Sequence, residues 1–260
     1  MPDLNDSIAL DAFSLRGKTA LITGAGSGLG LAMAHCMSRA GARVVVADMD
    51  AERAREAAEQ LGPRANWRAF DVSQTHLAQG FVDALIASTG PVDILVNNAG
   101  NHCKKPIEDM SIADFEAVLD VHVVGAFALT RAVVPHMKAR GTGSILFTAS
   151  MTSFLGQPNV TGYAAAKSAY LGMIRGLATE LSGAGLRVNG IAPGWIDTPM
   201  LRRAIEGDDA RRDKILGRTP MKRFGLPDDI GWAATYLASD AARFVNGHVL
   251  VVDGGALIGF

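Results

Sequence analysis

Residues Lys18–Gly30 read KTALITGAGSGLG, an apolar run rich in β-branched side chains that is followed by a glycine-rich turn. The run predicts a buried strand over Lys18–Thr23, and the residues after the turn predict a helix. Glycines at 24, 28 and 30 let the backbone turn sharply and approach a bound group closely. Because the N-terminus of a helix favours anions, the turn predicts a site for the phosphates of a nucleotide. A glycine turn with only a structural role is the alternative at this point.

The alternation of strand and helix continues along the chain. Further strands are expected at Arg43–Asp48, Asn66–Asp71, Asp93–Asn97, Ser144–Ala149, Arg187–Ile191 and Val249–Val252. Helices are expected near residues 28–40, 50–61, 74–88, 111–139, 162–183 and 228–238. The strands are nearly continuous apolar runs, which is typical of a sheet covered on both faces. The pattern predicts an α/β fold, a single doubly wound domain over residues 1–260 with a seven-stranded parallel sheet and helices on both faces.

The composition excludes several classes of protein. With 260 residues, 48% hydrophobic and 20% charged, the chain is not disordered, and a net charge of −1 argues against a nucleic acid partner. Cys36 and Cys103 are too few for a disulfide framework. We expect no run that spans a membrane, and the first residues, MPDLND, lack the pattern of a signal peptide. The sequence therefore predicts a soluble, cytoplasmic protein with no membrane partner and no nucleic acid partner.

The longest stretch expected to be irregular runs from about residue 193 to residue 227. Prolines at 193, 199, 220 and 227 interrupt it. A long insertion in a compact domain is usually a lid or a binding loop. Within Leu201–Arg223 eight basic residues stand against four acidic ones, so this segment is locally positive. We expect residues 193–227 to form a lid over the substrate.

Four further motifs accompany the glycine turn. They are Asn97-Asn98-Ala99-Gly100 after the fourth expected strand, Ser150 after the fifth, Tyr163-Ala-Ala-Ala-Lys167 at the start of a helix, and Pro193-Gly194 after the sixth. In this order and spacing the motifs resemble the short-chain dehydrogenase/reductase family over about residues 15–255. The resemblance implies a Rossmann fold, a dinucleotide cofactor, a small-molecule substrate and hydride transfer between an alcohol and a ketone. It implies no catalytic metal, and the histidines outside the motifs lack metal-ligand spacing.

The resemblance also assigns the contacts of the dinucleotide. They are Gly24, Ser27, Gly28, Leu29, Gly30, Asp48, Asp71, Val72, Asn97, Asn98, Ala99, Gly100, Tyr163, Lys167, Pro193, Gly194, Ile196 and Thr198. In the family, the positions of Asp71 and Val72 flank the adenine, those from 97 to 100 line a ribose, and that of Thr198 meets the carboxamide.

Asp48, at the end of the second expected strand, predicts which dinucleotide binds. A carboxylate there accepts the hydroxyls of the adenosine ribose and repels a 2′-phosphate. Two like charges about 4 Å apart cost about 4 kcal/mol at an effective dielectric of about 20. We therefore expect NAD rather than NADP. The alternative is that Asp48, like Asp50, only caps the next helix.

Tyr163 and Lys167 lie one helical turn apart and so share one face of the helix. A free phenol has a pKa near 10, and a nearby ammonium favours the tyrosinate. We therefore predict that Tyr163 removes the proton of an alcohol, and returns it in the reverse reaction. Lys167 would assist it and Ser150 would bond the substrate oxygen. Taken alone, this spacing is more often an ordinary surface pair, so the prediction depends on Ser150 and the glycine turn.

One residue departs from the family pattern. Where the family has an asparagine three residues before a glycine, this chain has His122 before Gly125. The family's asparagine holds a water in a proton relay to the lysine, and a neutral imidazole offers one donor and one acceptor. We include His122 in the catalytic set, with a tolerated polar core residue as the alternative. Because an imidazole titrates near neutrality, we expect His122→Asn to keep most of the activity and to alter its pH profile.

The loop Asn101-His102-Cys103-Lys104-Lys105 is expected to border the substrate. His102 and Lys104 join Ser150 and Tyr163 as predicted substrate contacts, and two positive segments facing one pocket would attract an anion. We expect a sugar acid or a polyol such as gluconate, and the chain is similar to the gluconate 5-dehydrogenase group. The alternatives are a 3-oxoacyl thioester (acyl carrier protein) reductase and, outside enzymes, a nucleotide-sensing or scaffold protein.

The resemblance implies a homotetramer that pairs the helices near 111–139 and 162–183. The closing segment Asp253–Phe260 is apolar after its aspartate. We expect it to pack against the core or a neighbouring subunit.

Overall fold

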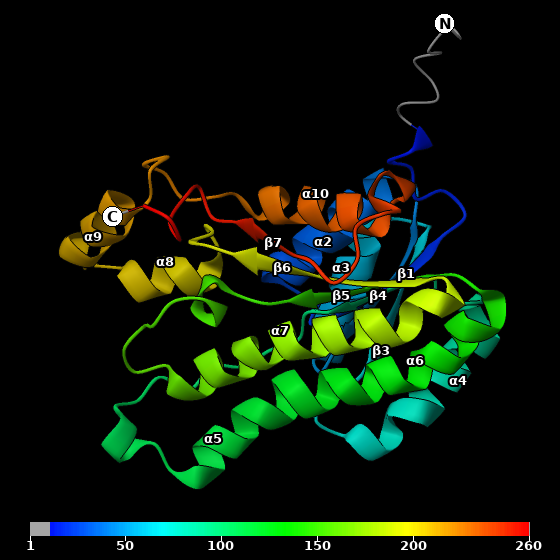
Figure 1. Cartoon of the computed structure of the whole chain (residues 1–260), viewed down its shortest axis with the longest axis horizontal. Helices are drawn as coiled ribbons and strands as arrows, with labels where there is room; N and C mark the ends of the chain where they lie inside the picture. Colours follow the sequence, from blue (N-terminus) through cyan, green and yellow to red (C-terminus); the bar gives the residue numbers. More distant parts are fainter. Residues whose placement is uncertain (1–10, 260) are drawn as a thin grey trace, which may run out of the picture.

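The computed structural model describes residues 11–259 (Figure 1). The expectations for the MPDLND segment and for Phe260 lie outside the described residues.

Seven parallel strands form one sheet in the order β3-β2-β1-β4-β5-β6-β7. They are β1 (Thr19–Thr23), β2 (Arg43–Asp48), β3 (Ala65–Ala69), β4 (Ile94–Asn97), β5 (Gly143–Thr148), β6 (Leu186–Pro193) and β7 (Val249–Val252). The predicted α/β Rossmann fold is confirmed. The strand order reverses between β1 and β4, and in sheets of this type the crevice that binds ligands lies at the carboxyl ends of the strands beside such a reversal.

Helices cover both faces of the sheet (Figure 1). One face carries α2 (Gly28–Arg39), α3 (Ala51–Leu61) and α10 (Pro227–Ala238), and the other carries α4 (Ala78–Thr89), α6 (Ala126–Arg140) and α7 (Thr161–Leu181). Each layer has its own core. Leu21 and Ile22 of β1 enter opposite cores, because successive side chains of a strand point to opposite faces.

The single helix expected near residues 111–139 has an interruption. It consists of α5 (Ile112–Leu119), a π-helical turn over Asp120–Gly125, and then α6. Among the described residues, this run over Ile112–Arg140 is the one helix that is long and apolar enough to cross a membrane by length and composition alone. In its most apolar window 44% is buried in the protein. Because α6 packs on α4 and the sheet while α5 contacts α7, the run is a partly buried core helix.

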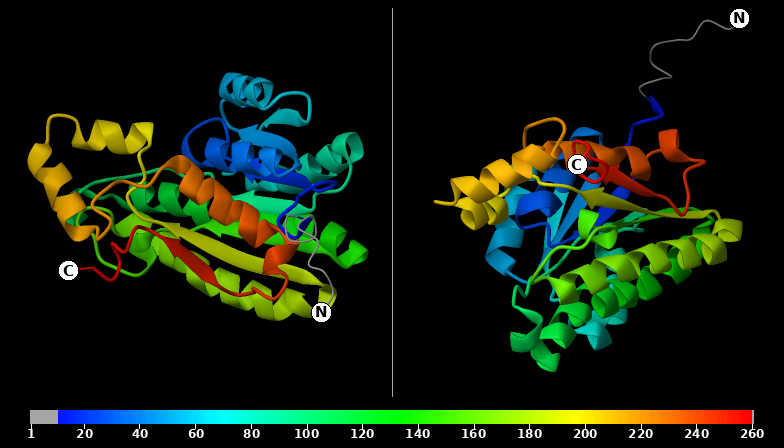
Figure 2. Two further views of the ribbon diagram at one scale, coloured as in Figure 1. Left: turned by 90° about the horizontal axis from the view of Figure 1, so that it is seen from above. Right: turned by 60° about the vertical axis from the view of Figure 1, so that its left-hand side comes forward.

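The stretch over residues 193–227 is more regular than predicted. It contains α8 (Pro199–Ile205) and α9 (Asp209–Arg218), capped by the side chains of Thr198 and Asp208. A bridge between Ile196 and Gly225 closes its base. Figure 2 shows these helices, in yellow and orange, projecting beyond the carboxyl ends of β6 and β7. We refer to residues 198–224 as the lid segment.

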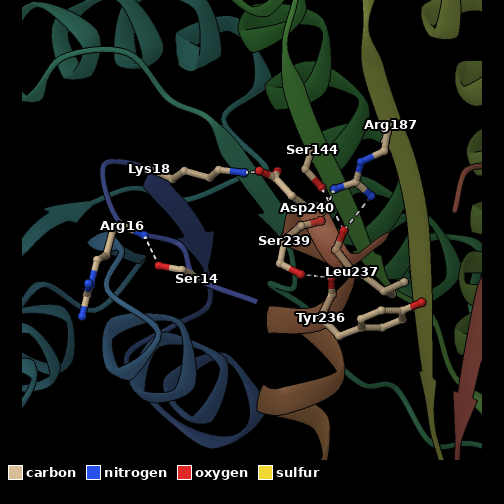
Figure 3. A network of polar contacts seen from close by, with 9 residues as sticks. All are labelled: Ser14, Arg16, Lys18, Ser144, Arg187, Tyr236, Leu237, Ser239 and Asp240. Atoms are coloured by element: carbon tan, nitrogen blue, oxygen red, sulfur yellow. Dashed lines mark hydrogen bonds and ion pairs between the residues drawn. The ribbon is translucent and has the colours of Figure 1, made fainter. Parts of the chain in front are cut away.

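A polar network fixes the opposite, amino edge of the sheet (Figure 3). The Arg187 guanidinium donates to the carbonyl oxygens of Leu237 (2.7 Å) and Ser239 (3.2 Å) at the C-terminal end of α10. Lys18 pairs with Asp240 at 2.6 Å. A cation stabilises the carbonyl end of a helix, so this network anchors α10 far from the crevice.

Candidate active site

The glycine turn forms a cradle of backbone at the N-terminus of α2. Gly24 and Gly28 have φ values of +61° and +57°, which side chains rarely adopt. A Cβ at Gly30 would lie 2.2 Å from the carbonyl oxygen of Gly24. Ser27, the N-cap of α2, makes no capping hydrogen bond with its side chain. The turn therefore leaves the first amides of α2 available to an anion, and its backbone fits the pyrophosphate of a dinucleotide.

Asn98 and Thr23 lock this turn to the neighbouring strands. The Asn98 side-chain amide donates to the carbonyl oxygens of Thr23 (2.9 Å) and Gly24 (3.2 Å) and accepts from the Thr148 hydroxyl (3.2 Å). The Thr23 hydroxyl accepts from the amides of Asn98 and Ala99. Sequence reasoning missed both threonines, because a hydroxyl at a strand end has no motif of its own.

The side chain of Asn97 points into the core. Its side chain is 2% exposed and donates to the Thr130 hydroxyl of α6 at 3.0 Å. Because successive residues of a strand face opposite ways, Asn98 reaches the turn while Asn97 enters the core. The predicted contact of Asn97 with the ribose would therefore use its backbone rather than its side chain, and it stays a prediction.

Asp48 lies at the carboxyl end of β2, beside the glycine turn. Its carboxylate accepts from the amides of Gly26 (3.0 Å) and Asp50 (3.1 Å). The cap of α3 is Asp50, whose side chain accepts from the amide of Arg53, so the capping alternative for Asp48 is wrong. The structure thus fixes a carboxylate beside the turn, where an adenosine ribose would lie.

Asp71 and Val72 follow β3. The Asp71 carboxylate accepts from the amide and the hydroxyl of Ser73, at 2.9 and 2.8 Å. Val72 is 7% exposed, and its carbonyl lies against Gly125, where a Cβ would approach to 2.6 Å. These contacts join the edge expected at the adenine to the π-helical turn.

Ser150, Tyr163 and Lys167 come together at the carboxyl edge of β5. Ser150 follows this strand, its side chain is hydrogen-bonded to Tyr163, and its Oγ accepts from the amide of Thr152 at 3.1 Å. Lys167, 3% exposed, donates from Nζ to the carbonyl oxygen of Thr148 at 2.5 Å. Its Nζ lies 5.5 Å from the ring centroid of Tyr163. The Thr148 carbonyl could not be predicted, because a backbone group leaves no sequence signal.

The pKa values in this cluster differ from the prediction. Burial raises the pKa of Tyr163 above its usual value, and the hydrogen bond to Ser150 opposes this only in part. Burial also lowers the pKa of Lys167 to about 7. The Lys167 amine points to a carbonyl and to the faces of the Tyr163 and Tyr170 rings. The expected lowering of the phenol pKa is therefore absent in the protein alone.

His122 lies in the π-helical turn and is 1% exposed. Its Nε2 is 2.9 Å from the carbonyl oxygen of Asn101, so Nε2 carries the proton and Nδ1 is an acceptor. Nδ1 is buried and has no hydrogen-bond partner within residues 11–259. Burial and the Lys167 charge lower the pKa of His122 to about 3. The expectation that His122 titrates near neutrality is therefore wrong.

Two imidazoles flank the Tyr163 phenol. The His102 ring stacks on it with centroids 4.5 Å apart and an interplanar angle of 14°. The His122 ring meets it edge-on, at 5.5 Å and 84°. Burial, with the charge of nearby Lys104 as a second cause, lowers the pKa of His102. The structure thus brings His102 directly to the predicted proton donor and acceptor.

The two lysines of the loop over residues 101–105 differ in their environment. Lys105 pairs with Asp114 at 2.8 Å, and its amide donates to the carbonyl oxygen of Asn159. Lys104 is exposed beside His102. Lys104 is therefore the cation of this loop that is accessible to a bound anion.

The base of the lid segment borders the same edge. Gly194 packs on Asp253, and Ile196 is 6% exposed under the bridge to Gly225. Arg202 forms a bidentate pair with Asp197, at 2.6 and 2.9 Å, which neutralises one of the lid's basic side chains. No group of side chains in the described part of the chain could hold a metal ion.

Comparisons with known proteins identify the family of this chain. The family model described as "Enoyl-(Acyl carrier protein) reductase" matches residues 24–256. The chain is 39% identical over 251 residues to 5-keto-D-gluconate 5-reductase of Escherichia coli (strain K12), covering 95% of this chain and 98% of that protein. The chain belongs to the short-chain dehydrogenase/reductase family.

Two solved structures of this family share the fold. A gluconate 5-dehydrogenase from Burkholderia cenocepacia J2315, in complex with NADP and tartrate, superposes with a TM-score of 0.93 at 39% identity, covering 97% of this chain and 100% of that chain. A 7α-hydroxysteroid dehydrogenase, complexed with NADH and 7-oxo glycochenodeoxycholic acid, gives 0.89 at 40% identity, covering 94% and 96%.

The present chain is an NAD(P)-dependent short-chain dehydrogenase/reductase that acts on secondary alcohols or ketones. The nucleotide-sensing and scaffold alternatives are therefore set aside. Its partners are a small-molecule substrate and a nucleotide cofactor.

Proposed function

We propose that this enzyme interconverts a secondary alcohol and a ketone on a hydroxylated acid of the gluconate type, with NAD as its preferred cofactor. The observation that carries the proposal is the position of Tyr163. It is hydrogen-bonded to Ser150, lies above the Lys167 amine and stacks on His102 at the crevice beside the glycine turn. Gly24, Gly28, Leu29 and Gly30 would hold the pyrophosphate, and the Ile196 and Thr198 segment would face the nicotinamide.

The residues of the chain divide the proton chemistry among themselves. Ser150 holds the substrate oxygen, and Tyr163 takes the alcohol proton in oxidation or returns it in reduction. An oxidised dinucleotide bound here would supply the hydride acceptor, and its positive nicotinamide would favour the phenolate of Tyr163 before the hydride is transferred. Lys167 places a second positive charge under the ring when it is protonated. His122 offers the buried acceptor Nδ1 near Lys167, in place of the asparagine of relatives.

Asp48 supports NAD over NADP. Its carboxylate is held by two backbone amides, so it cannot move away from a 2′-phosphate without losing both hydrogen bonds. The residue after it, Met49, is 74% exposed and carries no charge to offset the repulsion. The Burkholderia relative was solved with NADP, so the preference for NAD is the part of the proposal to be tested first.

Lys104 and the lid segment support an acidic substrate. Lys104 is exposed beside His102, and the lid adds exposed basic side chains at Arg203, Arg212, Lys214 and Arg218. Of the relatives named above, one is a keto-gluconate reductase and one was solved with tartrate, both hydroxylated acids, whereas the third was solved with a bile acid. A sugar acid offers both kinds of group. Its carboxylate would pair with these cations, and its hydroxyls would form hydrogen bonds with His102 and Ser150.

We also propose that the enzyme is a cytoplasmic homotetramer. Ile112, Val124 and Phe127 of the α5–α6 run are 75, 43 and 50% exposed. Val124 and Phe127 are three residues apart on this run, and neighbouring exposed apolar side chains often mark an interaction face.

The test is a matrix of cofactors and substrates with purified enzyme. NAD and NADP reduction is followed with gluconate and other sugar acids, polyols, simple secondary alcohols and a 7α-hydroxylated bile acid. The reverse reaction is followed with a 3-oxoacyl thioester. We expect the highest kcat/KM with a sugar acid and NAD. A higher value for the bile acid or the thioester would contradict the substrate class, and a preference for NADP would contradict the role of Asp48.

A further inference from the structure

The end of the chain forms a compact turn directly after β7. Both oxygens of the Asp253 carboxylate accept from backbone amides, Oδ1 from Gly255 (2.8 Å) and Oδ2 from Leu257 (2.6 Å). Ala256, between them, is 1% exposed. We call residues 253–259 the C-terminal turn. Asp253 supplies both side-chain acceptors of this turn, and three backbone hydrogen bonds within it add to them.

The C-terminal turn packs against the returning end of the lid segment. The amide of Met221 donates to the carbonyl oxygen of Gly254 at 3.2 Å. A Cβ at Gly255 would lie 2.9 Å from Cγ of Pro220. A Cβ at Gly259 would lie 2.8 Å from that atom and 2.9 Å from the carbonyl oxygen of Arg218. Backbone and a rigid ring therefore meet with no space between them, at the point where α9 ends.

The same turn contacts the wall of the crevice. The amide of Gly194 donates to the carbonyl oxygen of Val252 at 3.0 Å. A Cβ at Gly194 would lie 2.5 Å from Cβ of Asp253. Asp253 thus lies between Gly194, at the end of β6, and the far end of the lid. Figures 1 and 2 show the end of the chain, in red, beside the orange end of the lid.

We propose that Asp253 and the C-terminal turn are positioning elements that hold α8 and α9 in a fixed position over the substrate site. The bridge at Ile196 and Gly225 fixes the base of the lid, and the C-terminal turn fixes the end of α9. The turn touches no predicted substrate contact, so it acts on substrate affinity through the lid. That last step rests on the proposed function, whereas the positioning of the lid does not.

A matched pair of substitutions tests the packing. Gly259→Ala places a methyl group against Pro220 and the Arg218 carbonyl. Gly217→Ala makes the same change within α9, where a Cβ would meet nothing within 4 Å and φ is not positive. Hydrogen–deuterium exchange of residues 199–218 is measured in the cofactor-free protein. We expect Gly259→Ala to speed exchange of this segment roughly fivefold, as for the loss of one or two hydrogen bonds. Gly217→Ala should leave exchange unchanged or slow it, because alanine favours a helix.

Substitution of Asp253 tests the same point without adding bulk. Asp253→Ala removes both acceptors, and Asp253→Asn retains one. We expect Asp253→Ala to raise the KM for the substrate by roughly fivefold with kcat within twofold, and Asp253→Asn to recover part of that loss.

Equal exchange of residues 199–218 in wild type and Gly259→Ala would overturn the positioning role. So would a fall in kcat without a change in KM for Asp253→Ala. If wild type oxidised none of the offered substrates, the proposed function would fail, and the exchange comparison would still decide whether the C-terminal turn holds the lid.

Discussion

Lys167 lowers the stability of the fold and is needed for the proposed proton transfer. Its contacts are a backbone carbonyl and the faces of two aromatic rings, and burial lowers its pKa to about 7. An unfolded chain would hold the same amine near its ordinary pKa of 10.5. Between these values the unfolded state binds more protons, so this group makes the fold less stable as the pH decreases from 10.5 to 7.

Replacing Lys167 therefore has opposite effects on stability and on activity. We expect Lys167→Met to abolish turnover and to raise the melting temperature at pH 6, since no charge has to be buried. The gain should shrink as the pH rises through 7 and vanish above about 10.5, the ordinary pKa. Thermal denaturation at pH 6 and pH 10 measures the change in melting temperature at each pH. An equal change at the two pH values would contradict the buried charge.

His122 gives a second test at the same scale. Its pKa is about 3 in the folded protein, against 6.5 for an ordinary histidine. In this window the unfolded state binds the proton more tightly, so the wild type should lose stability as the pH falls below 6.5. We expect His122→Asn to weaken this acid sensitivity, to keep most of the turnover and to leave the pH profile between 6 and 9 unchanged. Urea denaturation at pH 4.5 and 7.5, with rates across that range, checks the prediction; a shifted profile would show that His122 titrates during turnover.

At the scale of elements, the clearest prediction concerns the glycine turn. A Cβ at Gly30 would lie 2.2 Å from the Gly24 carbonyl oxygen, whereas one at Gly80, in α4, would meet nothing within 4 Å. We expect Gly30→Ala to weaken dinucleotide binding more than tenfold, which is about 1.4 kcal/mol. Gly80→Ala serves as the control and should leave binding unchanged, because alanine only favours the helix. Calorimetric titration with NADH measures both, and equal dissociation constants would contradict the proposed cradle.

The strands were predicted to within about two residues, because buried parallel strands are continuous apolar runs. The lid helices were missed, because prolines were interpreted as interruptions. Pro199 instead occupies the first turn of α8, as Pro227 does in α10, where proline favours the start of a helix. The π-helical turn around His122 was also missed, because periodicity cannot locate one extra residue within a long apolar run.

Within the site, the motifs predicted which side chains lie together but did not predict their pKa values. Ser150, Tyr163 and Lys167 meet as predicted, whereas the pKa of Tyr163 is raised. Spacing on a helix shows which residues share a face, and it does not show how far each is desolvated. The assignment of NAD(P) to the glycine turn and the role of each site residue remain predictions.

At the scale of the whole molecule, the exposed apolar side chains of the α5–α6 run predict self-association. Phe127 is 50% exposed at the start of α6. We expect the wild type to be a tetramer by light scattering, and Phe127→Glu to produce smaller species, because a charge at the centre of an apolar interface is costly. Glu116→Lys changes the charge at an exposed position of α5 and serves as the control. It shows whether any change of charge on this run disrupts assembly. A monomeric wild type at micromolar concentration would contradict the assembly.

The central claim is that the Tyr163 hydroxyl moves the proton of the alcohol. It is tested by the rate of NAD reduction with the best sugar acid for wild type and Tyr163→Phe, after NADH titration has shown that both bind the cofactor equally. Removing only the hydroxyl should lower kcat by about 10³-fold, the usual contribution of a general acid or base. A kcat within tenfold of wild type would contradict the account.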